Sequence, residues 1–384
     1  MQKKLFVVVN IDSFLLSHRK EIALAAKQKG FQVTIVAHDT GRREEIEALG
    51  LRFINLPNAK SVKNIFKEFY ILIFLFTLYK TNKPDIVHHV GLKLILYGTT
   101  VAKFTGIENI VNAVSGLGIL FSGFKIMNKI LKTVTICILK FIHNRKNIFV
   151  IFQNDEDKNI FIASKIINEN QAYKIKGSGV DLSIYQYTPE PNNTDKVRII
   201  FAARMLRDKG VLELVDAARL LKKKYYHKAQ FLLCGDIDDN PKSLTKIELE
   251  NTVDGEYIQW LGHRNDVRKL LGHSHIFAFP SYYREGLPKS LIEACAVGRP
   301  IITTNSIGCK DCVIDNYNGF LVPIQNSKAL ADMLAILIDD KELRISMGQN
   351  SRIFAEKIFS IITVVDTHME IYNRLVKQIH VQQN

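Results

Sequence analysis

Short apolar segments alternate with amphipathic helical patterns along all 384 residues of the chain. Strand-like segments recur near 5–10, 32–37, 52–56, 85–90, 109–114, 147–153 and 172–177, and a second series begins at Val197. Such alternation predicts parallel sheets covered by helices on both faces, because parallel neighbours need a long crossover that is usually a helix. The length suits two domains of roughly 180 to 200 residues better than one.

A polar stretch with several prolines separates the two series of strands. Residues 182–196 include Pro189 and Pro191 among charged and amide side chains, as linkers often do. We therefore expect a first domain over 1–181, a linker over 182–196 and a second domain over 197–360. The remaining residues, 361–384, are predicted to form a helix that packs back on the first domain.

The segment from His275 to Val297 carries the most informative local pattern. An apolar run over 275–281 predicts a buried strand, Glu285 and Gly286 follow as a turn, and 287–297 reads as a helix. Glu293 lies eight positions after Glu285, roughly 12 Å away at 1.5 Å per helical residue. A helix N-terminus favours an anion such as a diphosphate, so this span suits a nucleotide sugar.

Two cations stand at a second junction of strand and helix. Arg204 and Lys209 follow the apolar strand that starts at Val197 and precede a helical pattern over 210–224. An arginine fork and a lysine point charge can together hold a diphosphate.

Two further strands end in turn residues on the same predicted edge. The strand at 231–236 ends near Gly235, and the strand at 258–264 ends near Leu261 and Arg264. Open parallel sheets bind ligands at the carboxyl ends of their strands, so these turns are expected to line one site.

These motifs resemble those of the retaining glycosyltransferases of family 4, with their E-x7-E motif. The resemblance covers nearly the whole chain and is strongest from Val197 to Gly319. It implies an α/β fold of the GT-B type, in which two Rossmann-like domains with parallel sheets face a cleft between them.

The resemblance also implies roles for individual residues of the second domain. Glu285 would hold the donor sugar, Glu293 the ribose, and Arg204 and Lys209 the diphosphate as it leaves, so that Glu285, Arg204 and Lys209 are the catalytic candidates. Uracil is expected near 261–264. The further donor-binding candidates are Gly286, Leu287, Pro288, Leu261, Arg264, Gly235, Ser115 and Gly116.

The first half supplies the acceptor-binding candidates. His18 and Arg19 follow the first strand, in a loop where family members commonly have glycines and this chain has none, which favours the acceptor over the donor. His88, His89 and Lys93 lie at the end of another strand, and which histidine faces the cleft stays open. Many members of the family have a histidine that contacts the donor sugar at about the position of Ser115. Because this chain has a serine there, the resemblance gives weaker support for the same contact.

The basic excess of the chain lies in its first half. Residues 1–181 hold 26 Lys and Arg against 14 Asp and Glu, whereas 182–384 hold 26 against 24, so the first half accounts for +12 of the net +14. An anionic partner is expected there, either nucleic acid or a membrane surface. Lys125, Lys129 and Lys132 share one face of a helical pattern, which favours an anionic bilayer. The alternative is an ordinary amphipathic helix packed on its own sheet with lysines in solvent.

No segment predicts a membrane span or a signal peptide. The apolar stretch Tyr70–Tyr79 has ten residues, half of what a bilayer requires, and is predicted to belong to a buried helix. The apolar run after Lys4 is too short for a signal sequence, and five cysteines are consistent with reduced thiols. We expect a cytoplasmic protein, peripheral to the inner face of the cell membrane.

The sequence thus predicts a retaining glycosyltransferase that moves an N-acetylhexosamine (GalNAc or GlcNAc) from a UDP donor to a polyprenyl-diphosphate-linked saccharide during synthesis of a bacterial surface polysaccharide. Asp236 and Asp238 are interpreted as a solvated acidic loop, and no metal or other cofactor is expected. Two alternatives remain open, a UDP-sugar 2-epimerase of the same fold and a nucleic-acid-binding protein.

Overall fold

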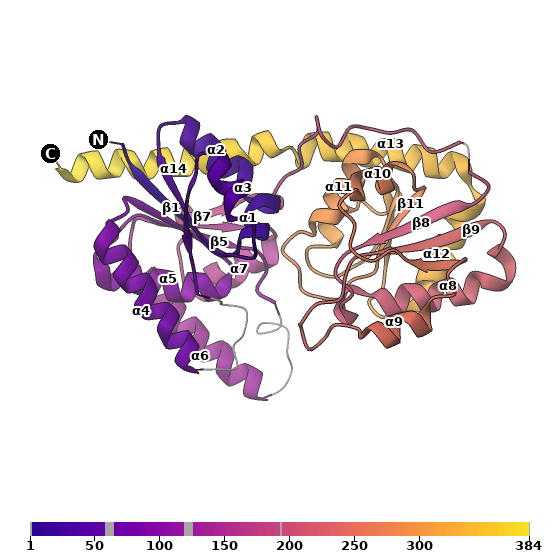
Figure 1. The fold of residues 1–384 in the computed structure, drawn as a ribbon, viewed down its shortest axis with the longest axis horizontal. Coiled ribbons are helices and arrows are strands. Elements are labelled where there is room, and N and C mark those ends of the chain that lie inside the picture. Colours follow the sequence, from indigo (N-terminus) through magenta and orange to yellow (C-terminus); the bar gives the residue numbers. More distant parts are fainter. Residues whose placement is uncertain (1, 58–64, 119–125, 193, 384) are drawn as a thin grey trace. The chain divides into compact units, whose positions relative to one another are not determined.

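The structure is a computed structural model that describes residues 2–57, 65–118, 126–192 and 194–383. The chain divides into two compact units, shown in Figure 1. Unit 1 comprises Met1–Ser178 with Ile361–Asn384, and unit 2 comprises Gly179–Ser360.

Unit 1 is built on a parallel sheet, which has seven strands among the described residues, in the order β3-β2-β1-β4-β5-β6-β7. The strands are β1 (Lys4–Ile11), β2 (Gln32–His38), β3 (Arg52–Asn55), β4 (Ile86–Val90), β5 (Ile110–Val114), β6 (Ile148–Phe152) and β7 (Ala172–Lys174). The central strands β4, β5 and β6 are buried at every residue because helices cover both of their faces. The predicted strands of the first half are confirmed, each to within a few residues.

Helices pack on both faces of this sheet. One face is covered by α4 (Ile65–Asn82), α5 (Leu92–Thr105), α6 (Ile126–His143) and α7 (Asp155–Ala163). The other face is covered by α1 (Asp12–His18), α2 (Lys20–Gln28), α3 (Arg43–Ala48) and the C-terminal helix α14 (Ile361–Gln383). Ile371, Tyr372 and Leu375 of α14 are fully buried in the core of this second face, so α14 is part of unit 1.

Helix α4 departs from the expectation of a buried helix. Ile71, Leu75 and Tyr79 are buried against the sheet, but Tyr70, Ile73 and Phe76 on the opposite side are exposed. The prediction was therefore wrong for one face of the helix. Within the described ranges, none of the helices combines the length and the apolar character needed to cross a bilayer.

Helix α6 contains the predicted basic segment. Lys125 lies outside the described residues, as does the side chain of Lys129, and Lys132 is half-buried. The helix packs on the sheet, as the alternative expects, but through Leu139 and Ile142. Ile130 and Val134, on the apolar side that was expected to pack, are exposed.

Unit 2 contains a second parallel sheet, with six strands among the described residues in the order β10-β9-β8-β11-β12-β13. The strands are β8 (Val197–Ala202), β9 (Ala229–Cys234), β10 (Ile258–Trp260), β11 (Ile276–Phe279), β12 (Ile301–Thr304) and β13 (Gly319–Val322). The helices are α8 (Val211–Tyr225), α9 (Lys246–Thr252), α10 (Val267–Gly272), α11 (Lys289–Val297), α12 (Ser327–Asp339) and α13 (Lys341–Ile358).

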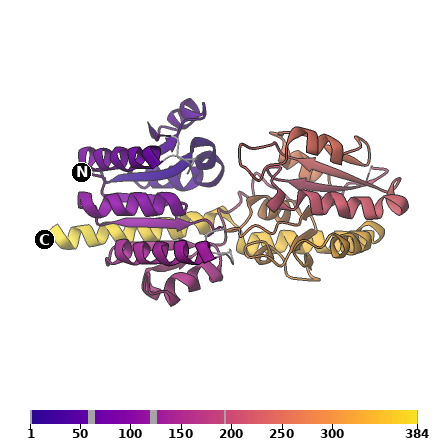
Figure 2. The same cartoon turned by 90° about the horizontal axis from the view of Figure 1, so that it is seen from below.

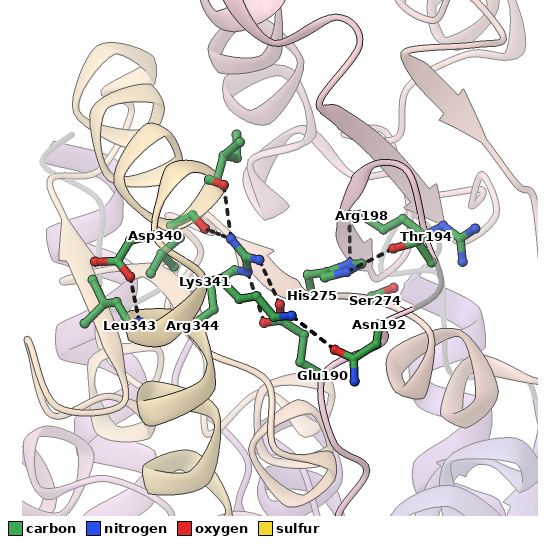
Figure 3. Close-up of polar contacts among 12 residues, drawn as sticks. Glu190, Asn192, Thr194, Arg198, Ser274, His275, Asp340, Lys341, Leu343 and Arg344 are labelled. Atoms are coloured by element: carbon green, nitrogen blue, oxygen red, sulfur yellow. Dashed lines mark hydrogen bonds and ion pairs between the residues drawn. The ribbon is translucent and has the colours of Figure 1, made fainter.

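The segment predicted as a linker packs on unit 2 instead (Figure 3). Glu190 forms a bidentate ion pair with Arg344 of α13, with Nε–Oε2 and Nη2–Oε1 distances of 3.0 and 2.7 Å, and both side chains are more than nine-tenths buried. Thr194 Oγ1 lies 3.2 Å from Nε2 of the buried His275. A polar, proline-containing sequence does not reveal these contacts, because the partners of Glu190 and Thr194 lie 154 and 81 residues away.

Candidate active site

The predicted catalytic residues lie on two loops that leave the sheet of unit 2 where its strand order reverses. Strands β8 and β11 are neighbours, and the chain continues from β8 to β9 on one side and from β11 to β12 on the other. Loops leaving the carboxyl ends of two such strands diverge and leave room for a ligand. The loop after β8 carries Arg204 and Lys209, and the loop after β11 carries Glu285.

Lys209 and Glu285 form an ion pair at this point. Their side chains are only 14% and 13% exposed. The ammonium group of Lys209 also lies 5.7 Å from the ring centroid of Phe279 and 5.4 Å from that of Tyr283, where the aromatic faces stabilise a cation. An anionic ligand at this site would meet a lysine that is already positioned and charge-balanced by Glu285.

Arg204 lies more openly on the same loop. Its side chain is 59% exposed, and its Nη1 donates a hydrogen bond of 2.7 Å to Oδ2 of Asp238. The interpretation of Asp236 and Asp238 as a solvated acidic loop was therefore wrong for Asp238. The carboxylate of Asp238 is bound to the Arg204 guanidinium, which the resemblance predicts to bind the diphosphate.

Two glycines allow the loops of unit 2 to approach each other. Gly210, with φ of +81°, follows Lys209, and a Cβ atom there would collide with the carbonyl of Pro280 at the end of β11. Gly235, with φ of +144°, ends β9, and a Cβ atom there would collide with the carbonyl of Ala203. Any side chain at either position would push these loops apart.

Glu293 is held inside unit 2 by a residue that sequence analysis missed. Its carboxylate is nearly buried in α11, and Oε1 accepts a hydrogen bond of 2.9 Å from the hydroxyl of Tyr185. Burial raises the pKa of Glu293, although Lys289 and the Tyr185 hydroxyl oppose the shift. Tyr185 lies in the segment predicted as a linker, 108 residues away, so no local pattern could identify it.

The other donor-binding candidates of unit 2 fall into two groups. Gly286, Leu287 and Pro288 are buried where α11 begins. Leu261 is half-buried after β10, and Arg264 is exposed and held in a bidentate pair by Asp266, at 2.8 and 2.7 Å. Gly235 N–H donates to the carbonyl of Gly262 at 2.9 Å, which keeps the ends of β9 and β10 together.

His88 and His89 are core residues of unit 1, and their prediction as acceptor-binding residues was wrong. His88 Nδ1 lies 2.6 Å from the hydroxyl of Tyr372, and His89 is bonded to Tyr79 at 2.8 Å and Asn112 at 2.9 Å. Both side chains are fully buried. Consecutive strand residues point to opposite faces, and helices cover both faces of β4, so each histidine enters a different helical layer. Burial lowers the pKa of His89 to about 4.

Arg19 is likewise buried, which contradicts its predicted contact with an acceptor. Its side chain lies in the core beside Phe14, and its burial lowers the pKa to about 10. His18 stacks on Phe14 with ring centroids 4.4 Å apart and is half-exposed. Lys93 forms an ion pair of 2.8 Å with Glu68 of α4. His18 and Lys93 stay predictions as acceptor-binding residues.

Ser115 and Gly116 form the loop after β5, at the carboxyl edge of the first sheet. Gly116 has φ of +105°, and the next residue, Leu117, donates its N–H to Oδ2 of Asp157 at 3.2 Å. This carboxylate, at the start of α7, fixes the loop within unit 1.

Sequence analysis also missed Asp12, which organises the loop after β2. Its buried carboxylate accepts hydrogen bonds from the backbone N–H groups of Ser13, Thr40 and Arg42, at 2.6, 2.6 and 3.1 Å, and from the Thr40 hydroxyl. Burial alone would raise the pKa of Asp12, but the hydrogen bonds from Thr40, Arg42 and Ser13 hold it below its ordinary value.

Two parallel-sheet units with cationic loops at a strand-order reversal define a GT-B glycosyltransferase fold. Solved structures share this fold over nearly the whole chain. A glycosyltransferase from Rickettsia africae has a TM-score of 0.76 and 23% identity over 98% of this chain and 99% of its own. Anabaena HepE in complex with UDP has a TM-score of 0.77 and 16% identity over 97% of this chain and 100% of its own. These likenesses establish the fold.

Residues 4–154 match the family model "Glycosyl transferase 4-like", and residues 187–354 match "Glycosyl transferases group 1". The chain belongs to the glycosyltransferases that carry these two domains, and the resemblance inferred from its motifs is confirmed. It is an enzyme that transfers a sugar.

Two relatives cover nearly the full chain. The N,N'-diacetylbacillosaminyl-diphospho-undecaprenol alpha-1,3-N-acetylgalactosaminyltransferase of Campylobacter jejuni is 27% identical over 94% of this chain and 96% of its own length. The UDP-Gal:alpha-D-GlcNAc-diphosphoundecaprenol alpha-1,3-galactosyltransferase of Escherichia coli is 26% identical over 89% of each chain.

Proposed function

We propose that this enzyme moves an N-acetylhexosamine residue (GalNAc or GlcNAc) from a UDP donor to a saccharide carried on a polyprenyl diphosphate. The observation that carries the proposal is the charge arrangement in unit 2, where the largely buried Lys209–Glu285 pair and the exposed Arg204 lie on loops at one strand-order reversal. Both full-length relatives transfer a hexose or N-acetylhexosamine to an undecaprenyl-diphosphate-linked sugar, which supports this class of acceptor.

The residues of unit 2 suit a reaction that retains the configuration of the sugar. The acceptor hydroxyl attacks the anomeric carbon on the face from which the diphosphate departs, and the bond from that carbon to the phosphate oxygen breaks. The hydroxyl proton passes to the departing phosphate oxygen, so no protein nucleophile is needed. Arg204, Lys209 and the N-terminus of α11 stabilise the negative charge that grows on the diphosphate, and Glu285 orients the sugar hydroxyls.

We also propose that the enzyme works without a metal ion, because unit 2 itself supplies positive charge for the diphosphate. Two cationic side chains and a helix N-terminus supply the positive charge that a divalent ion supplies in other nucleotide-sugar enzymes. Asp238, which could otherwise contribute to a metal site, is paired with Arg204.

A lipid-linked acceptor would place the enzyme at the inner face of the cell membrane. The net charge of +12 over residues 1–181 supports attachment of unit 1 to an anionic membrane surface. The two alternatives have less support: the relatives are transferases, which disfavours a 2-epimerase and a nucleic-acid-binding protein.

A donor screen tests the proposal directly. UDP-GalNAc, UDP-GlcNAc, UDP-galactose and UDP-glucose are each incubated with a synthetic polyprenyl-diphosphate sugar, and released UDP and the product anomer are measured. We expect acceptor-dependent UDP release with one of the N-acetylhexosamine donors and an α-linked product from an α-linked donor. UDP release or C2 epimerisation that is independent of the acceptor would exclude the proposal.

A further inference from the structure

Helix α4 presents an apolar stripe to solvent. Phe66, Phe69, Tyr70, Ile73 and Phe76 are between 39% and 82% exposed. Their spacing of three or four residues places them along one side of the helix, opposite the side that packs on the sheet. A helix that is apolar on both sides is normally buried on both sides. The outer side of α4 is therefore a candidate for contact with a membrane or with another apolar protein surface.

Two neighbouring helices extend this stripe. Phe104 at the end of α5 is 69% exposed. On α6, the exposed apolar residues are Ile130, Leu131, Val134, Ile138 and Phe141. Helix α5 packs against both α4 and α6, and Figure 2 shows the three helices side by side on one face of unit 1. The exposed apolar residues of α4, α5 and α6 are called the apolar face below.

The helices that carry this face are rich in lysine. Helices α4, α5 and α6 contain seven lysines and a single acidic residue, Glu68, which is held by Lys93 and the hydroxyl of Tyr97. The Lys103 ammonium lies 3.7 Å from the ring centroid of Phe141, and that of Lys80 lies 5.8 Å from Phe76. Cations and aromatic rings are therefore interleaved on one surface.

We propose that the apolar face inserts into the interface of an anionic bilayer, with α4, α5 and α6 lying against the membrane. Aromatic and aliphatic side chains would enter the boundary between headgroups and acyl chains, and the lysines of the same helices would contact lipid phosphates. The inference rests on the proposed function in that a lipid-linked acceptor requires the enzyme to reach the membrane.

The charge argues for a bilayer over a second copy of the chain. In a symmetric dimer through the apolar face, the lysines of α4 and α6 on one copy would approach those of the other, with Glu68 already paired inside each copy. An anionic bilayer supplies the opposite charge over the whole surface.

Vesicle flotation tests the proposal without requiring catalysis. Wild-type protein is expected to float with vesicles of phosphatidylcholine and phosphatidylglycerol, and much less with phosphatidylcholine alone. The triple substitution of Phe66, Phe69 and Ile73 by serine should reduce the partition coefficient on the order of tenfold or more, because three buried apolar contacts with the bilayer are lost. The matched control replaces Leu220 and Ile247 by serine. Both are exposed apolar residues of unit 2, at 59% and 71%, and their loss should leave flotation unchanged.

A fluorescent reporter tests insertion at the same position. The chain has one tryptophan, Trp260 of unit 2, so Phe69→Trp adds a single reporter to the apolar face. Its emission should shift to the blue on anionic vesicles and be quenched by brominated acyl chains, whereas Leu220→Trp should show neither effect.

Three outcomes overturn the proposal: equal flotation of wild-type protein and the serine triple variant, equal flotation on neutral and anionic vesicles, or a dimer in sedimentation that the triple variant abolishes while vesicles bind neither form. A helical circular dichroism spectrum and a urea unfolding midpoint equal to those of the wild type show that the triple variant is folded in unit 1 as well as in unit 2. Flotation that requires the apolar face, together with no acceptor-dependent UDP release, would reject the proposed function and leave the membrane surface standing.

Discussion

Freeing Arg204 from Asp238 is expected to tighten the binding of UDP. In the structure, the Arg204 guanidinium donates to Asp238, and a diphosphate must compete with that carboxylate. The variant Asp238→Asn keeps the size of the side chain but removes its charge. In this variant, Arg204 loses a weaker interaction when it leaves residue 238 to bind the diphosphate.

The exposure of the pair sets the size of the effect. The Arg204 side chain is 59% exposed and that of Asp238 is 25% exposed, so solvent screens their attraction. Ion pairs of this kind contribute about 0 to 1 kcal/mol. Since about 1.4 kcal/mol corresponds to a tenfold change, the Kd for UDP should fall by up to about fivefold.

Isothermal titration with UDP at low and high salt measures this effect. The gain should shrink as salt rises, because the screening length falls from about 10 Å at 0.1 M to about 3 Å at 1 M. In an Arg204→Ala background, Asp238→Asn should change little. Asp332→Asn is the matched control, because it breaks an exposed ion pair with Lys328 on α12. Weaker UDP binding by Asp238→Asn, or an equal gain in the Arg204→Ala background, would refute the competition.

Four further outcomes are expected. Glu285→Gln should lower kcat about 10²-fold or more with UDP binding largely kept, because it removes a contact with the sugar; retention of more than about a third of wild-type kcat would contradict that role. Lys209→Ala should lower kcat strongly and weaken UDP binding in calorimetry, since the ammonium meets charge that grows in the transition state. EDTA should leave the rate of UDP release unchanged, and recovery of activity only on adding magnesium or manganese would refute the metal-free proposal. Below pH 6.5, unit 1 should lose stability, because burial lowers the folded-state pKa of His89 and His143 to about 4 and the unfolded chain takes up their protons first. At pH 5 the loss of stability is ~2 kcal/mol for each histidine, at about 1.4 kcal/mol per pH unit. The urea midpoint of unfolding should therefore be lower at pH 5 than at pH 7. If the His89→Asn variant shows the same difference as the wild type, protonation of His89 does not contribute to it.

The sequence by itself determined the order and type of the elements. Apolar runs such as Ile148–Phe152 are long enough for a strand and too short for most helices, and they recur between amphipathic patterns. The junctions at Arg204, Lys209 and Glu285 were visible for the same reason, since each lies within a few residues of the strand that positions it. The strand order then places all three at one end of adjacent strands.

Only the tertiary structure decided which polar residues face a ligand. His88 and His89 stand at a strand end by sequence, yet the core encloses them because helices cover both faces of β4. Tyr185 and Glu190 acquire their roles from partners 108 and 154 residues away, at separations that no local pattern encodes. The apolar residues on the outer side of α4 are of the kind usually found in a core. They are exposed because nothing else in the described part of unit 1 packs against them. Periodicity reports what a segment could bury, and packing alone determines which of its faces is buried.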